Sequence, residues 1–342
     1  MKALQLISHG IPGVWNITDL AEPQPGPEEV VVNVIACGIN RLDLWLEEKG
    51  LPIPITLPRT AGSEIAGVIS ALGDDVDEWS IGDRVAIQSN LFCGECEFCL
   101  RGEESLCLHG ELLGIQCNGG FAEKAVVPWR SLVKLPDNVD FETSAALTLA
   151  GSTAMHMLTD RVEIPAGAWV LVMAGASGVG VAAIQIAKGL GAHVISTGST
   201  EEKRNLAMKL GAEYVVDTSN DAWPSEIRKI TEKRGVDFIV EHIGGSVIEN
   251  AMQCLARGGT LVTCGATAGR EIKLSLWPFF VKQQRLIGSY GRNRADLSAT
   301  LDWVAKGRLK PIIHKTCSFA DLPEALISLR NRAVLGKILF RP

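Results

Sequence analysis

The stretch AWVLVMAGASGVGVAAIQIAKGLGAHVISTG (168–198) constrains the fold of this chain more than any other segment. It has the pattern of an apolar strand, a glycine-rich turn, a helix and a second strand. Further strand-like segments follow it, separated by helical patterns: YVVD, VDFIVEHIG, GGTLVTCG and RLIGSYG. Strands that alternate with helices form a parallel sheet with helices on both faces. The second half of the chain therefore predicts a doubly wound α/β domain.

The first 150 residues follow a different pattern, in which short β-branched runs end at glycine or aspartate, as in EVVVNVIACGIN (29–40). After residue 292 a helical pattern precedes a last strand, VLGKILFRP (334–342). A chain of 342 residues is too long for one ordinary core. We therefore expect a β-rich domain over 1–150, an α/β domain over 151–291, and a return to the first domain over 292–342.

The glycine turn GASGVG lies between a strand and a helix, which is the context that a dinucleotide-binding fingerprint requires. Gly175 and Gly180 match the first and last positions of G-x-G-x-x-G, while Ser177 replaces the middle glycine. Tight turns in any α/β protein also contain glycine, but the complete unit favours a pyrophosphate site at the helix N-terminus. The candidate residues are Gly175, Ala176, Ser177, Gly178, Val179 and Gly180.

The end of the next strand indicates which dinucleotide the site takes. An NAD site normally has Asp or Glu there to bind the ribose hydroxyls. This strand instead ends with Gly198, Ser199 and Thr200, and Lys203 and Arg204 follow. Hydroxyls and cations suit a 2′-phosphate, because each charge-assisted hydrogen bond contributes about 1.5 to 3 kcal/mol. A solvated helix start is the alternative, since Glu201 and Glu202 share the turn. The pattern favours NADP(H) over NAD(H).

Four cysteines lie within one short loop, CGECEFCLRGEESLC (93–107). Cys93, Cys96, Cys99 and Cys107 have spacings that let a loop surround zinc with four thiolates. Such a site leaves no position for water or substrate, so it indicates a structural Zn²⁺. An iron–sulfur cluster is a weaker alternative because Leu108, not proline, follows the last cysteine. A redox role for Cys93 and Cys96 is a third possibility.

Charge and cysteine content narrow the class of protein. A net charge of −6 argues against a nucleic-acid partner. Residues 164–187 carry no charge, but Pro165 and the glycine turn divide the stretch, so we expect buried core and no membrane segment. The first residues, MKALQLISHGIPG, are a poor secretory signal. The nine cysteines indicate thiols and metal ligands rather than disulfides. We expect a cytoplasmic protein with a small-molecule substrate.

With these motifs the chain resembles the medium-chain dehydrogenase/reductase superfamily, which includes zinc-dependent alcohol dehydrogenases and zinc-free quinone oxidoreductases. The likeness covers essentially the whole chain and rests on four motifs: GSEIAGVI (62–69), GDRVA (82–86), the cysteine loop and the glycine turn. It implies a Rossmann doubly wound parallel sheet plus a β-rich GroES-like catalytic domain with a zinc lobe over residues 90–110. It also implies a homodimer or homotetramer that pairs along the sheet edge at 285–291.

The alcohol dehydrogenases of this superfamily hold a second, catalytic zinc, and its ligands are replaced here. In GINRLD (38–43), GSEIAG (62–67) and LTLAGST (147–153) the resemblance places Asn40, Ser63 and Leu149 at the ligand positions. Only Asp43 and Glu64 remain of the carboxylates around the metal. Leu42 stands where relatives carry a hydroxyl that relays the alcohol proton. An amide, a hydroxyl and an alkyl chain do not make a zinc site. We expect these residues to shape a substrate pocket instead.

The resemblance also suggests residues that contact the cofactor. Arg41 matches a position that reaches the pyrophosphate in many relatives, although a surface arginine is an equal alternative. The segments EHIGG (241–245) and CGATAG (264–269) end successive strands, and ligands bind at that edge of a doubly wound sheet. The candidates on the nicotinamide side are Ile243, Gly265, Ala266 and Thr267. His242 is a possible proton donor, but a packed histidine is the simpler interpretation.

Three functions remain open from the sequence. The favoured function is an NADPH-dependent reductase that transfers a hydride to a quinone or an α,β-unsaturated carbonyl, because these acceptors need no Lewis acid. The second is a zinc-dependent alcohol or aldehyde dehydrogenase. The third is a non-enzymatic NADPH-binding protein. Some enoyl reductases of the superfamily use a tyrosine near the Asn40 segment as acid, but Tyr214 and Tyr290 lie elsewhere. The proton donor stays open.

Overall fold

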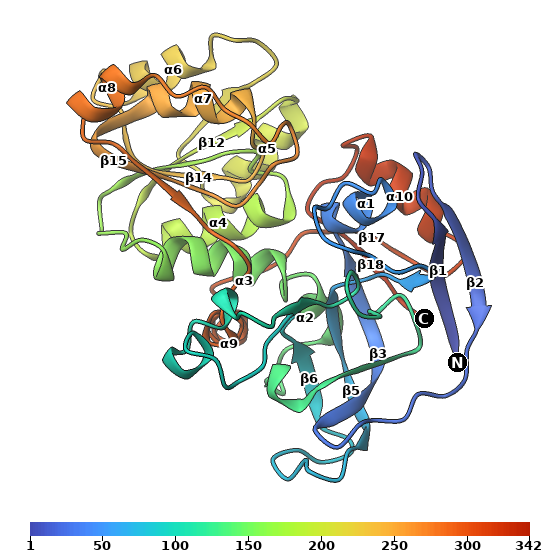
Figure 1. Cartoon of the computed structure of the whole chain (residues 1–342). Helices are drawn as coiled ribbons and strands as arrows, with labels where there is room; N and C mark the ends of the chain where they lie inside the picture. Colours follow the sequence, from blue (N-terminus) through green and yellow to red (C-terminus); the bar gives the residue numbers. More distant parts are fainter. The chain divides into compact units, whose positions relative to one another are not determined.

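The computed structural model describes residues 1–342, which form two compact units (Figure 1). The first unit consists of Met1–Ser152 and Arg292–Pro342, and the second is Thr153–Gly291. Helix α3 (Ala150–Met155) and the π-helix η4 (His156–Asp160) carry the chain from one to the other. No helix combines the length and the apolar composition that a membrane crossing requires.

The second unit is a doubly wound parallel sheet, which confirms the predicted fold class. Its six strands lie in the order β13 (Tyr214–Asp217), β12 (His193–Gly198), β11 (Trp169–Val172), β14 (Val236–Glu241), β15 (Leu255–Thr263) and β16 (Arg285–Gly288). Its helices are α4 (Gly178–Gly189), α5 (Glu201–Leu210), α6 (Trp223–Ile230), α7 (Ser246–Cys254) and α8 (Leu276–Val281). Helices cover both faces of this sheet (Figure 1).

The sheet's core explains the long uncharged stretch. Leu171, Ile195, Ile239 and Leu261 are fully buried between the helical layers, as central strands of parallel sheets are. The stretch 164–187 supplies β11 and most of α4. The strand order reverses between β11 and β14, and ligands of such sheets bind outside the carboxyl ends of the strands at this point. The glycine turn leaves β11 at that point.

The first unit is β-rich. Its main sheet has the order β10 (Leu132–Lys134), β6 (Arg84–Ile87), β5 (Glu64–Leu72), β3 (Glu29–Ile39), β18 (Lys337–Phe340) and β17 (Ile313–Cys317), and β9 (Lys124–Pro128) also pairs with β3. A smaller sheet contains β2 (Val14–Asp19), β1 (Lys2–Ser8) and β4 (Arg59–Thr60). Strands β7 (Asn90–Leu91) and β8 (Glu111–Leu112) pair beside the cysteine loop.

The remaining elements of the first unit are helices and 3₁₀ turns. Its helices are α1 (Arg41–Glu47), α2 (Phe141–Ala145), α9 (Arg294–Ala305) and α10 (Leu322–Arg330), with 3₁₀ turns η1 (Cys99–Arg101), η2 (Glu104–Leu106) and η3 (Trp129–Ser131). Phe121 and Phe340 are fully buried and meet edge to face in its core, with ring centroids 5.6 Å apart. The C-terminal strands thus complete a sheet that the N-terminal strands begin.

Candidate active site

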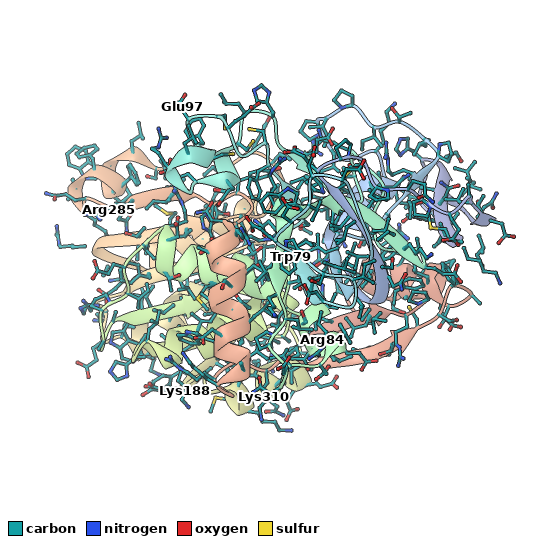
Figure 2. The ribbon with its side chains drawn as sticks, turned by 90° about the horizontal axis from the view of Figure 1, so that it is seen from below. Trp79, Arg84, Glu97, Lys188, Arg285 and Lys310 are labelled. Atoms are coloured by element: carbon teal, nitrogen blue, oxygen red, sulfur yellow. The ribbon has the colours of Figure 1, made fainter.

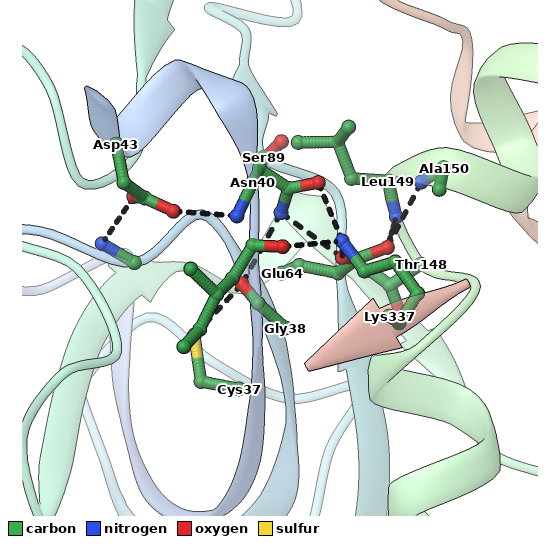
Figure 3. A network of polar contacts seen from close by, with 12 residues as sticks. Cys37, Gly38, Asn40, Asp43, Glu64, Ser89, Thr148, Leu149, Ala150 and Lys337 are labelled. Atoms are coloured by element: carbon green, nitrogen blue, oxygen red, sulfur yellow. Dashed lines mark hydrogen bonds and ion pairs between the residues drawn. The ribbon is translucent and has the colours of Figure 1, made fainter. Parts of the chain in front are cut away.

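Three strands of the first unit bring polar side chains together (Figure 3). The pairing of β3 with β5 sets Gly38 opposite Glu64, and the pairing of β3 with β18 sets Ile39 opposite Ile338. Lys337, one residue before Ile338, therefore lies beside Asn40. Gly38 permits the close approach, because a Cβ atom there would collide with the Glu64 carboxylate.

The carboxylate of Glu64 is fully buried and uses all of its acceptor capacity. Its Oε1 accepts hydrogen bonds from the backbone N–H groups of Leu149, at 2.7 Å, and Ala150, at 2.9 Å. Its Oε2 accepts from Asn40 Nδ2 at 3.0 Å and lies 2.7 Å from Lys337 Nζ. A carboxylate offers about four lone-pair directions, and each of them has a donor here.

Lys337 is a buried cation that the sequence analysis missed. Only 4% of the residue is exposed, and its Nζ donates to Ile39 O at 2.7 Å and Asn40 Oδ1 at 2.6 Å in addition to the ion pair with Glu64. The three N–H groups of the ammonium are thus all engaged. One signal was available: a lysine that opens an apolar strand such as KILF is seldom buried unless an anion pairs with it.

Asn40 and Asp43 are also buried, and their side chains are engaged in hydrogen bonds. The amide hydrogens of Asn40 go to Gly38 O, at 3.1 Å, and to Glu64. The carboxylate of Asp43 accepts from the backbone N–H of Asn40 at 2.7 Å and of Gly62 at 3.2 Å. Burial raises the pKa of Asp43 to about 7, against the lowering effect of these backbone hydrogen bonds. These side chains form one closed network.

The residues at the catalytic zinc positions do not fit that metal. The Ser63 hydroxyl is fully buried and donates to Leu113 O at 2.6 Å. Leu149 offers an alkyl side chain, and its backbone N–H is bound to Glu64. Zinc takes thiolate, imidazole or carboxylate ligands. Of the two carboxylates beside these residues, Glu64 already neutralises the Lys337 cation, and Asp43 accepts from the backbone N–H groups of Asn40 and Gly62.

Arg41 is the first residue of α1, and its guanidinium is partly buried with Nε in contact with no hydrogen-bond acceptor. Burial lowers the pKa of Arg41, the nearby carboxylate of Glu48 raises it, and the positive charges of Arg332 and Arg330 lower it. Arg330 is itself paired with Glu47 and Glu48, so charges of both signs surround this predicted cofactor contact. Tyr214 and Tyr290, in the second unit, are exposed.

The four cysteines of the predicted zinc lobe converge. Their sulfur atoms all lie within 4.8 Å of one another. The Cys96–Cys99 and Cys93–Cys107 sulfur distances are 3.5 Å, and the Cys93–Cys99 and Cys96–Cys107 distances are 3.9 Å. A tetrahedron with Zn–S bonds of about 2.3 Å has edges of about 3.8 Å. The set fits a four-thiolate zinc and leaves no open coordination position. Glu97, labelled in Figure 2, belongs to this lobe.

The glycine turn of the second unit joins β11 to α4. Ser177 is the N-cap of α4, and its Oγ accepts from the Gly180 N–H at 3.0 Å. Ser177, Gly178 and Val179 are partly exposed, whereas Gly175, Ala176 and Gly180 are buried. The first N–H groups of a helix lack intrahelical acceptors and favour an anion. The turn therefore suits the pyrophosphate of a dinucleotide.

The end of β12 carries the residues predicted to select the cofactor. Thr200 caps α5, and its Oγ1 accepts from Lys203 N at 3.3 Å. Arg204, however, donates to Gly198 O and forms an ion pair with Asp217 Oδ2, both at 3.0 Å. The β12–β13 register sets Gly198 opposite Asp217. The expectation of two cations at this strand end is therefore corrected: Arg204 is paired with a carboxylate that sequence position did not reveal.

The predicted nicotinamide-side residues follow β14 and β15. The Glu241 carboxylate accepts from Ile243 N at 2.6 Å, Gly244 N at 2.9 Å and Thr263 Oγ1 at 2.7 Å, which fixes the turn after β14. Gly265 lies against the backbone of His242 so closely that a Cβ atom would not fit. Ala266 and Thr267 continue this segment, and Ala268 N donates to Ile243 O at 2.7 Å. The two strand ends thus form one rigid edge.

Comparison with known proteins identifies the class. The model of the alcohol dehydrogenase GroES-like domain matches residues 26–137, and the model of zinc-binding dehydrogenases matches residues 178–306. An alcohol dehydrogenase of Geobacillus stearothermophilus is 33% identical over 87% of both chains. An acryloyl-coenzyme A reductase of Sulfurisphaera tokodaii is 29% identical over 96% of both. The crystal structure of an NAD-dependent alcohol dehydrogenase, 36% identical, superposes with a TM-score of 0.95 over all of both chains.

The fold, the glycine turn and these relatives define an NAD(P)H-dependent oxidoreductase. More specifically, the chain belongs to the zinc-type medium-chain dehydrogenase/reductase superfamily, which confirms the resemblance seen in the sequence.

Proposed function

We propose that this enzyme is an NADPH-dependent reductase that transfers a hydride to a quinone or an α,β-unsaturated carbonyl compound without a catalytic zinc. The observation that carries the proposal is the buried network of Asn40, Glu64 and Lys337. The catalytic-zinc positions hold an amide, a hydroxyl and an alkyl side chain, and the lysine ammonium occupies the neighbouring carboxylate of Glu64. Without a Lewis acid, the metal-assisted conversion of an alcohol to its alkoxide at neutral pH is lost.

An activated alkene or a quinone does not need a catalytic zinc ion, because its carbon is already electrophilic. NADPH, when bound, would supply a hydride to that carbon or ring, and the resulting enolate or hydroquinone anion would take its proton from solvent or a side chain. The chain's own residues bind and orient the dinucleotide. The turn 175–180 holds its pyrophosphate at the N-terminus of α4. The turn after β14 is held in place by Glu241. Such positioning lowers the barrier by making the reaction effectively unimolecular. The name of one relative, the acryloyl-coenzyme A reductase, supports this class of acceptor.

The preference for NADPH is part of the proposal. Its support is the glycine, serine and threonine at 198–200, where an NAD site carries a carboxylate, and the cation of Lys203. Arg204 contributes less than the sequence suggested, because Asp217 neutralises it. We also propose one structural Zn²⁺ per chain, held by the four cysteines of the lobe.

The experiment that tests the function compares two panels of substrates on enzyme purified without added metal. The expected result is NADPH oxidation with enones or quinones in a one-to-one ratio, and no NADP⁺ reduction with primary or secondary alcohols. Zinc-stimulated alcohol oxidation without enone or quinone reduction would overturn the proposal. That outcome would support the second candidate, a zinc-dependent alcohol or aldehyde dehydrogenase, which the names of most relatives favour.

A further inference from the structure

Ser177 replaces the middle glycine of the fingerprint, and its hydroxyl has two close neighbours. The Oγ accepts from the Gly180 N–H at 3.0 Å as the cap of α4. It also lies 2.8 Å from Nε2 of His242, the residue that follows β14. A glycine at this position offers a ligand only its backbone, whereas a serine adds one O–H donor and two lone pairs. The direction of that O–H depends on the proton of His242.

The other ring nitrogen of His242 decides where this proton lies. Nδ1 is buried and has no hydrogen-bond partner. A buried N–H without an acceptor is rare and costly, whereas an unused acceptor is tolerated more readily. The tautomer with its proton on Nε2 therefore avoids the larger penalty. Burial also lowers the pKa of His242 to about 4, so the neutral ring carries a single N–H at physiological pH.

With the proton on Nε2, His242 donates to Ser177. Both lone pairs of the Ser177 hydroxyl are then filled, one by Gly180 N–H and one by His242 Nε2–H. Its own hydrogen has no acceptor among these neighbours. Ser177 is partly exposed at the start of α4, beside the first N–H groups of the helix. This is where a pyrophosphate oxygen binds in a doubly wound sheet.

We propose that the Ser177 hydroxyl donates a hydrogen bond to a pyrophosphate oxygen of the bound dinucleotide, and that His242 is the positioning residue that aims it. The inference rests on the dinucleotide binding in the proposed function, but not on the preference for NADPH or on the acceptor. The turn after β14 holds the imidazole in place, because Glu241 binds the N–H groups of Ile243 and Gly244 and Gly265 packs against the His242 backbone.

The test measures dissociation constants of NADPH and NADH by fluorescence titration without substrate. Ser177→Gly removes the hydroxyl and barely weakens the helix cap. We expect it to raise both constants by about tenfold, because a hydrogen bond to a charged group contributes about 1.5 to 3 kcal/mol. The ratio of the two constants stays as in the wild type, since both cofactors share the pyrophosphate.

Two His242 variants distinguish hydrogen-bond donation to Ser177 from simple packing of the side chain. Gln places an N–H donor near the position of Nε2, whereas Leu has a similar volume and no donor. We expect His242→Gln to bind both cofactors within about twofold of wild type, and His242→Leu to lose about fivefold. Thermal unfolding of each variant checks that the fold is intact.

Two results would overturn the inference: Ser177→Gly binding both cofactors as tightly as wild type, or equal binding by His242→Gln and His242→Leu. Different results would contradict the proposed function. A wild-type enzyme that prefers NADH contradicts the NADPH assignment, yet the inference stands if Ser177→Gly weakens both cofactors equally. A wild type that binds neither dinucleotide overturns both.

Discussion

At the scale of single residues, Lys337 determines what the first unit can do. Its ammonium is buried, gives all its hydrogens to Ile39, Asn40 and Glu64, and leaves none for a substrate. It therefore holds Asn40 and Glu64 in place rather than donating a proton. A buried ion pair of this kind is costly to break, because the partner that remains is a buried charge without compensation.

Replacing Lys337 with methionine leaves Glu64 charged and buried. We expect Lys337→Met to lower the free energy of unfolding by about 3 to 5 kcal/mol, measured by urea denaturation. The matched control is the double variant Lys337→Met/Glu64→Gln, in which no charge is stranded. It should recover a large part of the loss, and equal destabilisation of the two variants would contradict the ion-pair account.

The raised pKa of Asp43 predicts that the free energy of unfolding depends on pH. Its folded pKa of about 7 lies above the ordinary value, mainly because of burial. Between the unfolded and folded pKa values the folded state therefore holds a proton that the unfolded state has lost. The contribution of Asp43 to the free energy of unfolding is therefore largest at low pH. It decreases by about 1.4 kcal/mol per pH unit as the pH rises toward 7.

The Asp43→Asn variant cannot ionise and should lack this slope. The check is urea denaturation of both proteins at several pH values from 5 to 8. The wild type should lose stability relative to Asp43→Asn as the pH rises. A constant difference between the two proteins across this range would show that the pKa of Asp43 is not raised.

At the scale of elements, the proposed preference for NADPH over NADH depends on the end of strand β12. Strand β12 ends at Gly198 beside the cap of α5, and the three nearest neighbours of a Cβ atom there would lie at 3.1 to 3.2 Å: Lys203 Cβ, Arg204 Cγ and Arg204 N, which must yield slightly. We expect Gly198→Asp to shift the preference from NADPH toward NADH by tenfold or more, because a carboxylate repels the 2′-phosphate and binds the ribose hydroxyls. Dissociation constants for both cofactors measure the shift.

Lys203→Met is the matched control for that strand end. It removes a cation without adding a carboxylate, so it should weaken NADPH by about tenfold and leave NADH unchanged. If neither variant changes the ratio of the two dissociation constants, the 2′-phosphate does not bind at the end of β12.

Local patterns explain which elements the sequence could predict. The doubly wound sheet and the cysteine lobe follow from short periodicities and close spacings, such as strand–turn–helix at 168–189. The Asn40–Lys337 contact joins residues 297 positions apart, and the β3–β18 register that creates it leaves no local trace. The Arg204–Asp217 pair was missed for the same reason: it depends on strands β12 and β13 lying side by side.

At the scale of the whole molecule, the second unit ends in a strand with no neighbour on one side. Strand β16 is the edge of its sheet, and Arg285, at its start, points away from the ribbon in Figure 2. Trp277, Phe280 and Tyr290 are more than half exposed in the adjoining segments. Unpaired edges and exposed apolar clusters mark interaction surfaces. We propose that two copies pair along this edge to form a homodimer.

Light scattering tests the dimer. We expect a solution mass of twice the 36.7 kDa chain, and a shift toward monomer in Trp277→Lys. Ile81→Lys, at an exposed apolar residue of the first unit, is the matched control and should stay dimeric. A wild-type mass of one chain would contradict the proposal, and a mass of four chains would indicate a further interface.

The central claim is that one metal ion is structural and none is catalytic, and zinc per chain measures it most directly. Elemental analysis of protein purified without added metal should give a value near one, and a variant with Cys96→Ser and Cys99→Ser should give a value near zero. A value near two, with one zinc retained in that double variant, would contradict the claim, because it would mean that a second metal site exists outside the cysteine loop. Alcohol oxidation would then become the reaction to test first.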